Sequence, residues 1–267
     1  MISDYKNQYD DSKNLDARIA LHQLYSLNKT GWMNWFFQQY NLKENQTILE
    51  LGCGNGDLWK LNADKIPVGV NIVLTEKSPG MLDAAKQNTR GIAGIKYKAA
   101  DAQEIHFCDD EFDIVIANHM LYHVTDIDKA LGEIARVLKP DGVFYATANG
   151  KDNMKEIPGI LSGFDPAVKS SIGTGVSAFG LENGEKTLRE HFSNVKIIKR
   201  NDGLHITKPK PLIDYLLSSG GMDNVNEIIT GGKVPEFEIY IQKLFEKTGY
   251  IDISKSAGVF ISSSPVK

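Results

Sequence analysis

Residues 48–57 read ILELGCGNGD, a short apolar run that leads directly into three glycines at alternate positions. The apolar run indicates a buried strand, and the glycines allow a tight turn whose backbone a ligand can approach closely. Twenty residues beyond Gly56, Glu76 ends the next apolar run, where a carboxylate can accept hydrogen bonds from both hydroxyls of a ribose. The alternative is a plain tight turn between a strand and a helix. The loop and the acid together favour a nucleoside-containing ligand.

The charges around the glycines indicate which nucleoside fits. Glu50 precedes the glycines and Asp57 follows them, and both carboxylates would repel a pyrophosphate at the N-terminus of the first helix. The spacing is GxGxG and lacks the third glycine of GxGxxG. S-adenosylmethionine has an adenosine, no phosphate, and positive sulfonium and ammonium groups that acidic neighbours stabilise. S-adenosylmethionine is therefore the predicted cofactor.

The rest of the chain alternates short β-branched runs with longer amphipathic stretches, which is typical of a parallel sheet with helices on both faces. The predicted fold is α/β: a doubly wound, Rossmann-like sheet of seven mostly parallel strands whose last strand is antiparallel. The expected strands lie near Thr47–Leu51, Val70–Thr75, Gly94–Lys98, Phe112–Ala117, Gly142–Ala148, Asn194–Arg200 and Gly258–Ser263. An apolar stripe predicts a helix at Asp126–Leu138, which the sequence KPDG at residues 139–142 ends in a turn.

Segments outside this alternation predict the domain organisation. Residues 1–45 are rich in aromatic and helix-spaced apolar residues and are expected to form an N-terminal helical cap. Residues 46–267 are expected to form the core of a single structural domain, with helical insertions at 150–185 and 203–250. Ligands of open α/β sheets bind outside the carboxyl ends of the strands, so the two insertions are expected to cover the substrate there.

Composition and charge exclude several classes of protein. The chain has 267 residues, of which 42% are hydrophobic and 24% charged, and this excludes a disordered chain. With 30 basic and 34 acidic residues, nothing in the net charge favours a nucleic-acid partner. No apolar run approaches the ~18 residues of a membrane span, and no signal-peptide segment opens the chain, so a cytoplasmic protein is expected. Cys53 and Cys108 do not have the spacing of a metal site, and no metal is predicted.

Five motifs follow one another in a characteristic order. They are the glycine loop, LTEKSPGML at residues 74–82, Asp101-Ala102, FDIVIANH at residues 112–119, and residues 130–142 with their LKPDG turn. In this order they resemble the motifs of class I S-adenosylmethionine-dependent methyltransferases, and the type 11, UbiE-like branch is the most similar. The resemblance covers about residues 46–148 and implies the same fold and cofactor that the glycine loop indicates.

The resemblance also implies which residues hold the cofactor. It places Glu50 or the glycine loop at the methionine part, Glu76 at the ribose, Lys77, Met81, Asp101 and Ala102 around the adenine, and Asn118 at the methyl-donor end. The predicted set also includes Gly52, Cys53, Gly54, Gly56 and, as partner of the methionine carboxylate, Arg18. Two alternatives remain open, because Asp101 can cap the following turn and Arg18 can be a solvated helix residue.

The residues after the fourth strand are the predicted acceptor site. A sulfonium carries its own leaving group, so the protein must mainly align a nucleophile and exclude water. His119 and His123 are the candidate catalytic residues, because a histidine accepts a proton near neutral pH. Tyr122 and Trp32 complete the predicted acceptor-binding set. The alternative is that the two histidines only pack and that Trp32 is a core aromatic residue.

The predicted function is methyl transfer from S-adenosylmethionine to an oxygen, nitrogen or carbon nucleophile of a small-molecule acceptor, by in-line displacement. One alternative is an RNA base methyltransferase, although the position after the fourth strand reads NHML instead of the Asn/Asp-Pro-Pro-aromatic signature of amino-methylating enzymes. The other is a non-catalytic S-adenosylmethionine-binding regulatory module. The sequence leaves the acceptor molecule and the oligomeric state open.

Overall fold

The computed structural model describes residues 12–169, 178–218 and 224–267, without the side chains of residues 12–18 and Asn226. The chain divides into two compact units. The first, called the sheet unit here, consists of residues 30–150, 175–200 and 257–267. The second, called the helical unit, consists of residues 1–29, 151–174 and 201–256.

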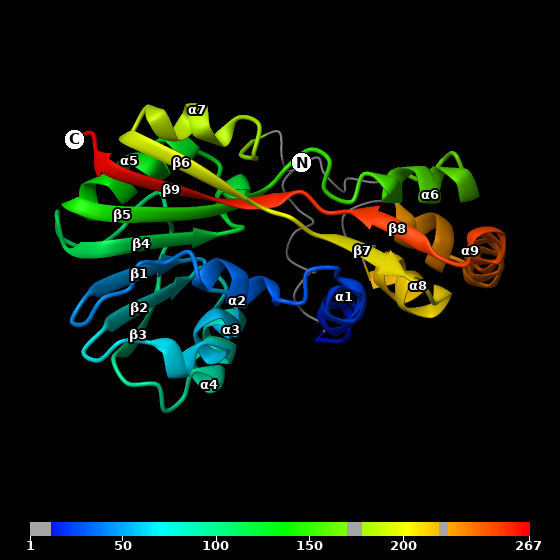
Figure 1. The fold of residues 1–267 in the computed structure, drawn as a ribbon, viewed down its shortest axis with the longest axis horizontal. Coiled ribbons are helices and arrows are strands. Elements are labelled where there is room, and N and C mark those ends of the chain that lie inside the picture. Colours follow the sequence, from blue (N-terminus) through cyan, green and yellow to red (C-terminus); the bar gives the residue numbers. More distant parts are fainter. Residues whose placement is uncertain (1–11, 170–177, 219–223) are drawn as a thin grey trace. The chain divides into compact units, whose positions relative to one another are not determined.

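The sheet unit is built on seven strands in the order β3-β2-β1-β4-β5-β9-β6 (Figure 1). The strands are β1 (Thr47–Leu51), β2 (Asn71–Glu76), β3 (Ile95–Ala99), β4 (Phe112–Asn118), β5 (Leu138–Asn149), β6 (Phe192–Arg200) and β9 (Ala257–Pro265). The five strands from β3 to β5 pair in parallel, whereas β9 is antiparallel to both β5 and β6. The predicted doubly wound sheet with an antiparallel last strand is confirmed.

Helices cover both faces of this sheet because successive side chains of a strand point to opposite faces. Leu49 and Leu51 of β1 pack in one core with Leu131 and Ile134 of α5. Ile48, which directly precedes Leu49 and points to the other face, packs in a second core with the helices that precede and follow β1 and β2. The helices are α2 (Trp32–Phe37), α3 (Asp57–Lys60), α4 (Pro79–Asn88), α5 (Ile127–Val137) and α7 (Gly184–Arg189).

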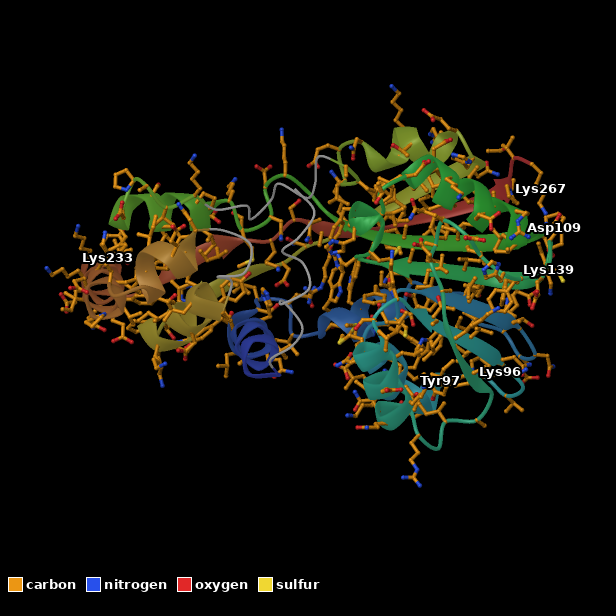
Figure 2. All side chains as sticks on the ribbon, turned by 180° about the vertical axis from the view of Figure 1, so that it is seen from behind. Lys96, Tyr97, Asp109, Lys139, Lys233 and Lys267 are labelled. Atoms are coloured by element: carbon orange, nitrogen blue, oxygen red, sulfur yellow. The ribbon has the colours of Figure 1, made fainter. Side chains whose placement is uncertain are left out.

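The amino ends of the parallel strands are joined by partly exposed ion pairs. Lys139 Nζ at the start of β5 lies 2.7 Å from Asp113 Oδ1 at the start of β4. Lys267, which follows the antiparallel β9, contacts Asp110 just before β4, and Figure 2 shows both lysines at this end of the sheet. Such partly exposed pairs add little to stability. They lie at the edge opposite the glycine loop and do not indicate a site.

The helical unit has its own hydrophobic core. Its elements are α1 (Ser12–Tyr25), α6 (Glu156–Phe164), α8 (Pro209–Ser218), a π-helical turn (Asn226–Thr230), α9 (Val234–Thr248) and an antiparallel pair of strands, β7 (Gly203–Ile206) and β8 (Ile251–Ser254). Leu21 of α1, Leu212 of α8 and Phe237 of α9 are among the fully buried side chains of this core. Burial of this apolar surface holds the segments together although they are far apart in the sequence.

Three features differ from the sequence-based expectations. Residues 12–45, the described part of the expected cap, are divided between the two units, because α1 packs on α8 in the helical unit while Phe36 and Phe37 of α2 are buried in the sheet unit. The strands β7 and β8 were not expected. The predicted turn at 139–142 is instead part of β5, with a register shift opposite Phe112 and Ile114.

Most of the described insertion residues share a unit with α1. The described parts of the expected insertions that fall in the helical unit together with α1 are residues 151–169, 203–218 and 224–250, whereas residues 178–185 fall in the sheet unit. Residues 170–177 of the first insertion lie outside the described residues. Among the described helices, none is long and apolar enough to cross a membrane.

Candidate cofactor and acceptor site

The glycine loop is a turn that only glycines form without strain. Gly52, Gly54 and Gly56 have φ angles of +66°, +57° and +76°, in the left-handed region that L side chains rarely adopt. The amide of Cys53 donates to the carbonyl of Thr75 at 2.9 Å, which ties the loop to the end of β2. The sequence thus folds into a fixed turn between β1 and the single turn of α3.

Glu76 stands at the centre of the adjoining loop, at the end of β2. Its Oε2 accepts a hydrogen bond from the Gly54 amide at 3.1 Å. Its Oε1 accepts from the amides of Lys77 at 2.7 Å and Ser78 at 3.0 Å. One carboxylate therefore holds both turns, and it lies where the sequence predicts the ribose acid.

Glu50 is buried beneath the glycine loop with 2% of its surface exposed. Its Oε2 accepts from the Trp59 indole at 2.6 Å, and its Oε1 accepts from the Asn118 side-chain amide at 3.0 Å. Burial raises the pKa of Glu50 to about 7, and the charge of Glu76 adds to the rise, although both hydrogen bonds oppose it. Burial likewise raises the pKa of the Cys53 thiol.

Asp101 follows β3 and is held in one orientation. Its Oδ1 accepts from the Gln103 amide at 2.9 Å and from the Gln103 side chain at 3.0 Å. Its Oδ2 lies 3.0 Å from Lys77 Nζ. The backbone bond of Gln103 is the main cause that lowers the pKa of Asp101 to about 2, and Lys77 contributes. Ala102 beside it is buried.

The loop after β4 lies against the glycine loop. Asn118 ends β4, and its side-chain amide also donates to the Tyr40 hydroxyl at 3.2 Å. His119 has a φ of +49°, and its amide donates to Thr147 Oγ1 at 3.0 Å. A Cβ on Gly52 would lie 3.0 Å from Met120 Cβ, so these two residues are in close contact.

Aromatic rings gather at this loop. The ring centroids of Trp32 and His119 are 4.9 Å apart, those of His119 and Tyr122 are 6.3 Å apart, and those of Tyr122 and His123 are 4.5 Å apart. Partial burial lowers the pKa of His123, and the charge of Glu76 opposes this effect. The structure thus brings all four predicted acceptor residues into one row of rings beside Asn118.

The structure also supplies partners that the sequence analysis missed. Tyr40 and Trp59 bond to the Asn118–Glu50 pair, Gln103 orients Asp101, and Arg200 lies at the carboxyl edge beside Trp32. Tyr40 and Arg200 lie far in sequence from the residues they contact, so no local pattern marks them. Gln103 is only two residues from Asp101 and Trp59 nine from Glu50, but neither contact belongs to a motif of the sequence. The predicted residue Arg18 lies in α1, and its side chain is outside the described part of the chain.

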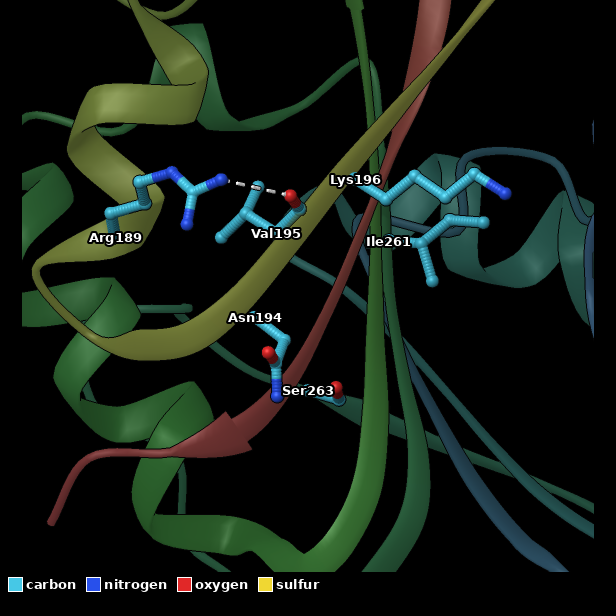
Figure 3. Close-up of a pocket in the computed structure, with 6 residues that line it drawn as sticks. All are labelled: Arg189, Asn194, Val195, Lys196, Ile261 and Ser263. Carbon is cyan, nitrogen blue, oxygen red and sulfur yellow. Dashed lines mark hydrogen bonds between the residues drawn. The ribbon is translucent and has the colours of Figure 1, made fainter.

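A separate pocket of about 350 Å³ lies on the edge strand β6 and its neighbour β9 (Figure 3). It is lined by Arg189, Asn194, Val195, Lys196, Ile261 and Ser263. Arg189 Nη2 donates to the Val195 carbonyl at 3.2 Å across it. Asn194 pairs with Ser263 toward the amino edge of the sheet, so this pocket contains none of the predicted site residues.

Comparison with known proteins agrees with this geometry. A family model described as a methyltransferase domain matches residues 49–146. The demethylmenaquinone methyltransferase of Lactobacillus johnsonii is 36% identical over 141 residues, which are 49% of this chain and 58% of that protein. The ubiquinone/menaquinone biosynthesis C-methyltransferase UbiE of Pectobacterium atrosepticum is 26% identical over 207 residues, 76% of this chain and 77% of that protein.

The fold is shared more widely. One solved structure with this fold is the phosphoethanolamine N-methyltransferase 2 of Haemonchus contortus in complex with S-adenosyl-L-methionine, which has a TM-score of 0.58 at 18% sequence identity. The match covers 98% of this chain and 59% of the Haemonchus chain. Sheet order, glycine loop and family match together define a class I S-adenosylmethionine-dependent methyltransferase. Within that class the chain is similar to the UbiE-like branch, to which the two named relatives point. S-adenosylmethionine is its cofactor.

The residues present fit this cofactor. A Cβ on Gly54 would lie 3.6 Å from Met81 Cε, so the glycine loop and Met81 are direct neighbours, as the resemblance implies for residues that hold one cofactor. Carboxylates end β2 and follow β3, and such groups can accept hydrogen bonds from ribose hydroxyls and from an adenine amino group. The buried carboxyl of Glu50 would be stabilised in its ionised form by a positive ligand. A pyrophosphate would fit poorly, because Glu50 and Asp57 would repel it and α3 has only one turn to bind it at its N-terminus.

Proposed function

We propose that this chain methylates a ring carbon of a small hydroxyarene or hydroquinone, with S-adenosylmethionine as the methyl donor. The observation that carries the proposal is the row of rings formed by Trp32, His119, Tyr122 and His123, which begins next to Asn118 at the end of β4. Aromatic side chains pack well against a planar aromatic acceptor. The names of the two curated relatives support a quinone-type acceptor.

We assign the cofactor contacts to the residues that the sequence predicts. Glu76 accepts from the ribose, Asp101 and Ala102 meet the polar edge of adenine, Met81 and Lys77 flank its faces, and Glu50 with the glycine loop faces the methionine part. When bound, the cofactor supplies an electrophilic methyl carbon whose bond to sulfur breaks, with the electron pair left on sulfur, as the bond to the acceptor carbon forms.

The chain's own residues act on the acceptor. His119 accepts the proton of the acceptor hydroxyl, because an ionised hydroxyl makes the neighbouring ring carbon nucleophilic and imidazole takes up a proton near neutral pH. Its ring stays beside Trp32 at 4.9 Å, while its backbone is anchored to Thr147. The rings around it exclude water, which favours alignment of the carbon with the methyl group. The ring proton that the new methyl group replaces leaves to solvent.

The test is incubation of the protein with S-adenosylmethionine and 1,4-naphthalenediol kept reduced under nitrogen. We expect S-adenosylhomocysteine and a diol that carries one added methyl group on a ring carbon, identified by mass spectrometry and NMR. Parallel reactions with total tRNA and with no acceptor separate the RNA and non-catalytic alternatives. Product formation with tRNA alone, or at the same rate with no acceptor, would overturn the proposal.

A further inference from the structure

A buried carboxyl group lies between the glycine loop and the loop after β4. Glu50 is 2% exposed, and its two oxygens accept from the Trp59 indole at 2.6 Å and from the Asn118 side-chain amide at 3.0 Å. Both of these donors are neutral, and the charge that acts on the carboxyl group, that of Glu76, is negative. Burial and the negative neighbour disfavour the ionised form, which a positive ligand would favour.

The titratable groups around this carboxyl group are neutral or have other partners. Burial raises the pKa values of the Tyr40 hydroxyl, which follows α2, and of the Cys53 thiol in the glycine loop, so both stay neutral near pH 7. The charged residues of α3, Asp57 and Lys60, bond to other side chains. The ring of His119, after β4, lies in the row of acceptor rings. The buried carboxyl group is itself poised to titrate, because burial raises its pKa to about 7.

The charge of the ligand changes on methyl transfer. The methionine part has an ammonium and a carboxylate on one carbon in both S-adenosylmethionine and S-adenosylhomocysteine, and these two charges nearly cancel at a distance. The sulfonium of S-adenosylmethionine has no such partner. The proposed function places the methyl-donor end at Asn118, whose amide bonds to Glu50. An opposite charge within about 4–6 Å lowers the pKa of a carboxyl group by about 1–3 units.

We infer that Glu50 selects the charged methyl donor over its product, because it releases its proton when S-adenosylmethionine binds and takes one up again when the sulfonium charge is lost. The inference rests on the proposed function, which places the methionine part at Glu50. Charges balance over the reaction: the methyl group replaces one proton of the acceptor, which leaves to solvent, and Glu50 gains one proton from solvent. No redox step is involved.

The experiment counts the protons released on binding, by titration calorimetry in two buffers of different ionisation enthalpy. At about pH 6.5, S-adenosylmethionine should release about half a proton or more per molecule bound, since the pKa of Glu50 falls from about 7 by about one unit or more. S-adenosylhomocysteine should release far less. The ratio of the dissociation constant of S-adenosylhomocysteine to that of S-adenosylmethionine should rise about tenfold or more between about pH 5 and 8.

Three variants assign the proton to Glu50. Glu50→Gln should release no proton and lose the pH dependence of the ratio. Asp57→Asn, the matched control, removes the other acid beside the glycines and should keep both. Trp59→Phe keeps the carboxyl group but removes an indole donor that favours its ionised form. The pH above which the ratio levels off should therefore be higher in Trp59→Phe, which tests the inference even if Glu50→Gln does not fold.

Melting curves show which variants are folded. The inference is overturned if S-adenosylmethionine releases no proton from wild-type protein, or if S-adenosylhomocysteine releases as many. It is also overturned if folded Glu50→Gln keeps the release, or if folded Trp59→Phe has the pH dependence of the wild-type protein.

Methyl transfer to 1,4-naphthalenediol is measured separately in wild-type protein. Proton release that depends on Glu50 and on the sulfonium, without methyl transfer, would refute the proposed acceptor and leave the inference on Glu50 standing. Methyl transfer without proton release would refute the inference alone.

Discussion

The side-chain amide of Asn118 bonds at 3.0 Å to the carboxyl group of Glu50, and so joins the end of β4 to the strand that precedes the glycine loop. The same amide reaches the Tyr40 hydroxyl at 3.2 Å, and Trp59 donates to the other oxygen of Glu50. The buried carboxyl group of Glu50, bonded to Trp59 and Asn118, thus links the glycine loop to the loop after β4. The protonation of Glu50 should therefore affect both.

The first prediction concerns stability against pH. The pKa of Glu50 is raised to about 7 in the folded chain and is 4.5 without the fold, so the folded state holds an extra proton between these values. The free energy of unfolding contributed by Glu50 is therefore fully present below about pH 4.5 and falls as pH rises toward 7. The loss approaches about 3 kcal/mol, at about 1.4 kcal/mol for each pKa unit. Urea unfolding at several pH values measures it.

Glu50→Gln is the control for this effect, because the amide has nearly the same shape and does not ionise. Its free energy of unfolding should vary less between about pH 5 and 7 than that of the wild-type protein. An equal slope in both proteins would assign the pH dependence to other groups.

The second prediction concerns cofactor affinity. Glu76→Ala should weaken binding of S-adenosylhomocysteine by ~1.5–3 kcal/mol, because it removes a charged acceptor and releases the amides of Gly54 and Ser78. Asp101→Ala should weaken it less, because Asp101 is already bonded to Gln103 and paired with Lys77. Calorimetry measures both constants, with the exposed Glu104→Ala as the control. Unchanged binding in folded Glu76→Ala would make Glu76 only a turn former.

The sheet could be predicted from the sequence because its strands are buried apolar runs. Every predicted strand is present. The runs that form β1 and β4 are apolar at almost every position, and such runs are typical of strands in a sheet that helices cover on both faces. The strands β7 and β8 have only four residues each and lie far apart in the chain, so no local alternation marks them. The sequence KPDG at 139–142 reads as a turn, and only pairing with β4 makes it part of β5.

The candidate site could also be predicted in part from the sequence. Glu50, Glu76, Asp101 and Asn118 follow from the rule that ligands bind at the carboxyl ends of parallel strands. The residues that surround these four could not be predicted by this rule. Arg200, for example, contacts Trp32 only once the sheet has brought the end of β6 close to α2. The cover over the substrate and the roles of the individual residues stay predictions.

The third prediction concerns the glycine loop. Gly52→Ala should destabilise the fold by about 1 kcal/mol or more and weaken cofactor binding, because φ is +66° and the new Cβ would lie 3.0 Å from Met120 Cβ. Gly80→Ala is the matched control, since a Cβ there meets nothing within 4 Å and its position is helical. It should stabilise the fold by about 0.5–1 kcal/mol. Thermal melts with and without S-adenosylhomocysteine compare the two variants.

The double variant Gly52→Ala/Met120→Ala separates the two causes in this loop. It removes the close contact and leaves the positive φ, so it should recover only part of the loss. Full recovery would show that the contact alone requires glycine. Wild-type stability in the single variant would contradict the prediction.

The fourth prediction concerns proton transfer by His119. Because His119 has a φ of +49°, an alanine there would add backbone strain, whereas asparagine tolerates this conformation. His119→Asn should therefore keep the fold and the cofactor affinity, and lower kcat with 1,4-naphthalenediol by ~10², the usual contribution of a general base. His106→Asn, at an exposed position that faces Glu104, is the control and should keep full activity. If His119 only orients the acceptor, KM should rise while kcat stays near the wild-type value. Wild-type kcat and KM in His119→Asn would remove His119 from the reaction and leave Trp32, Tyr122 and His123 as the remaining candidates for acceptor binding.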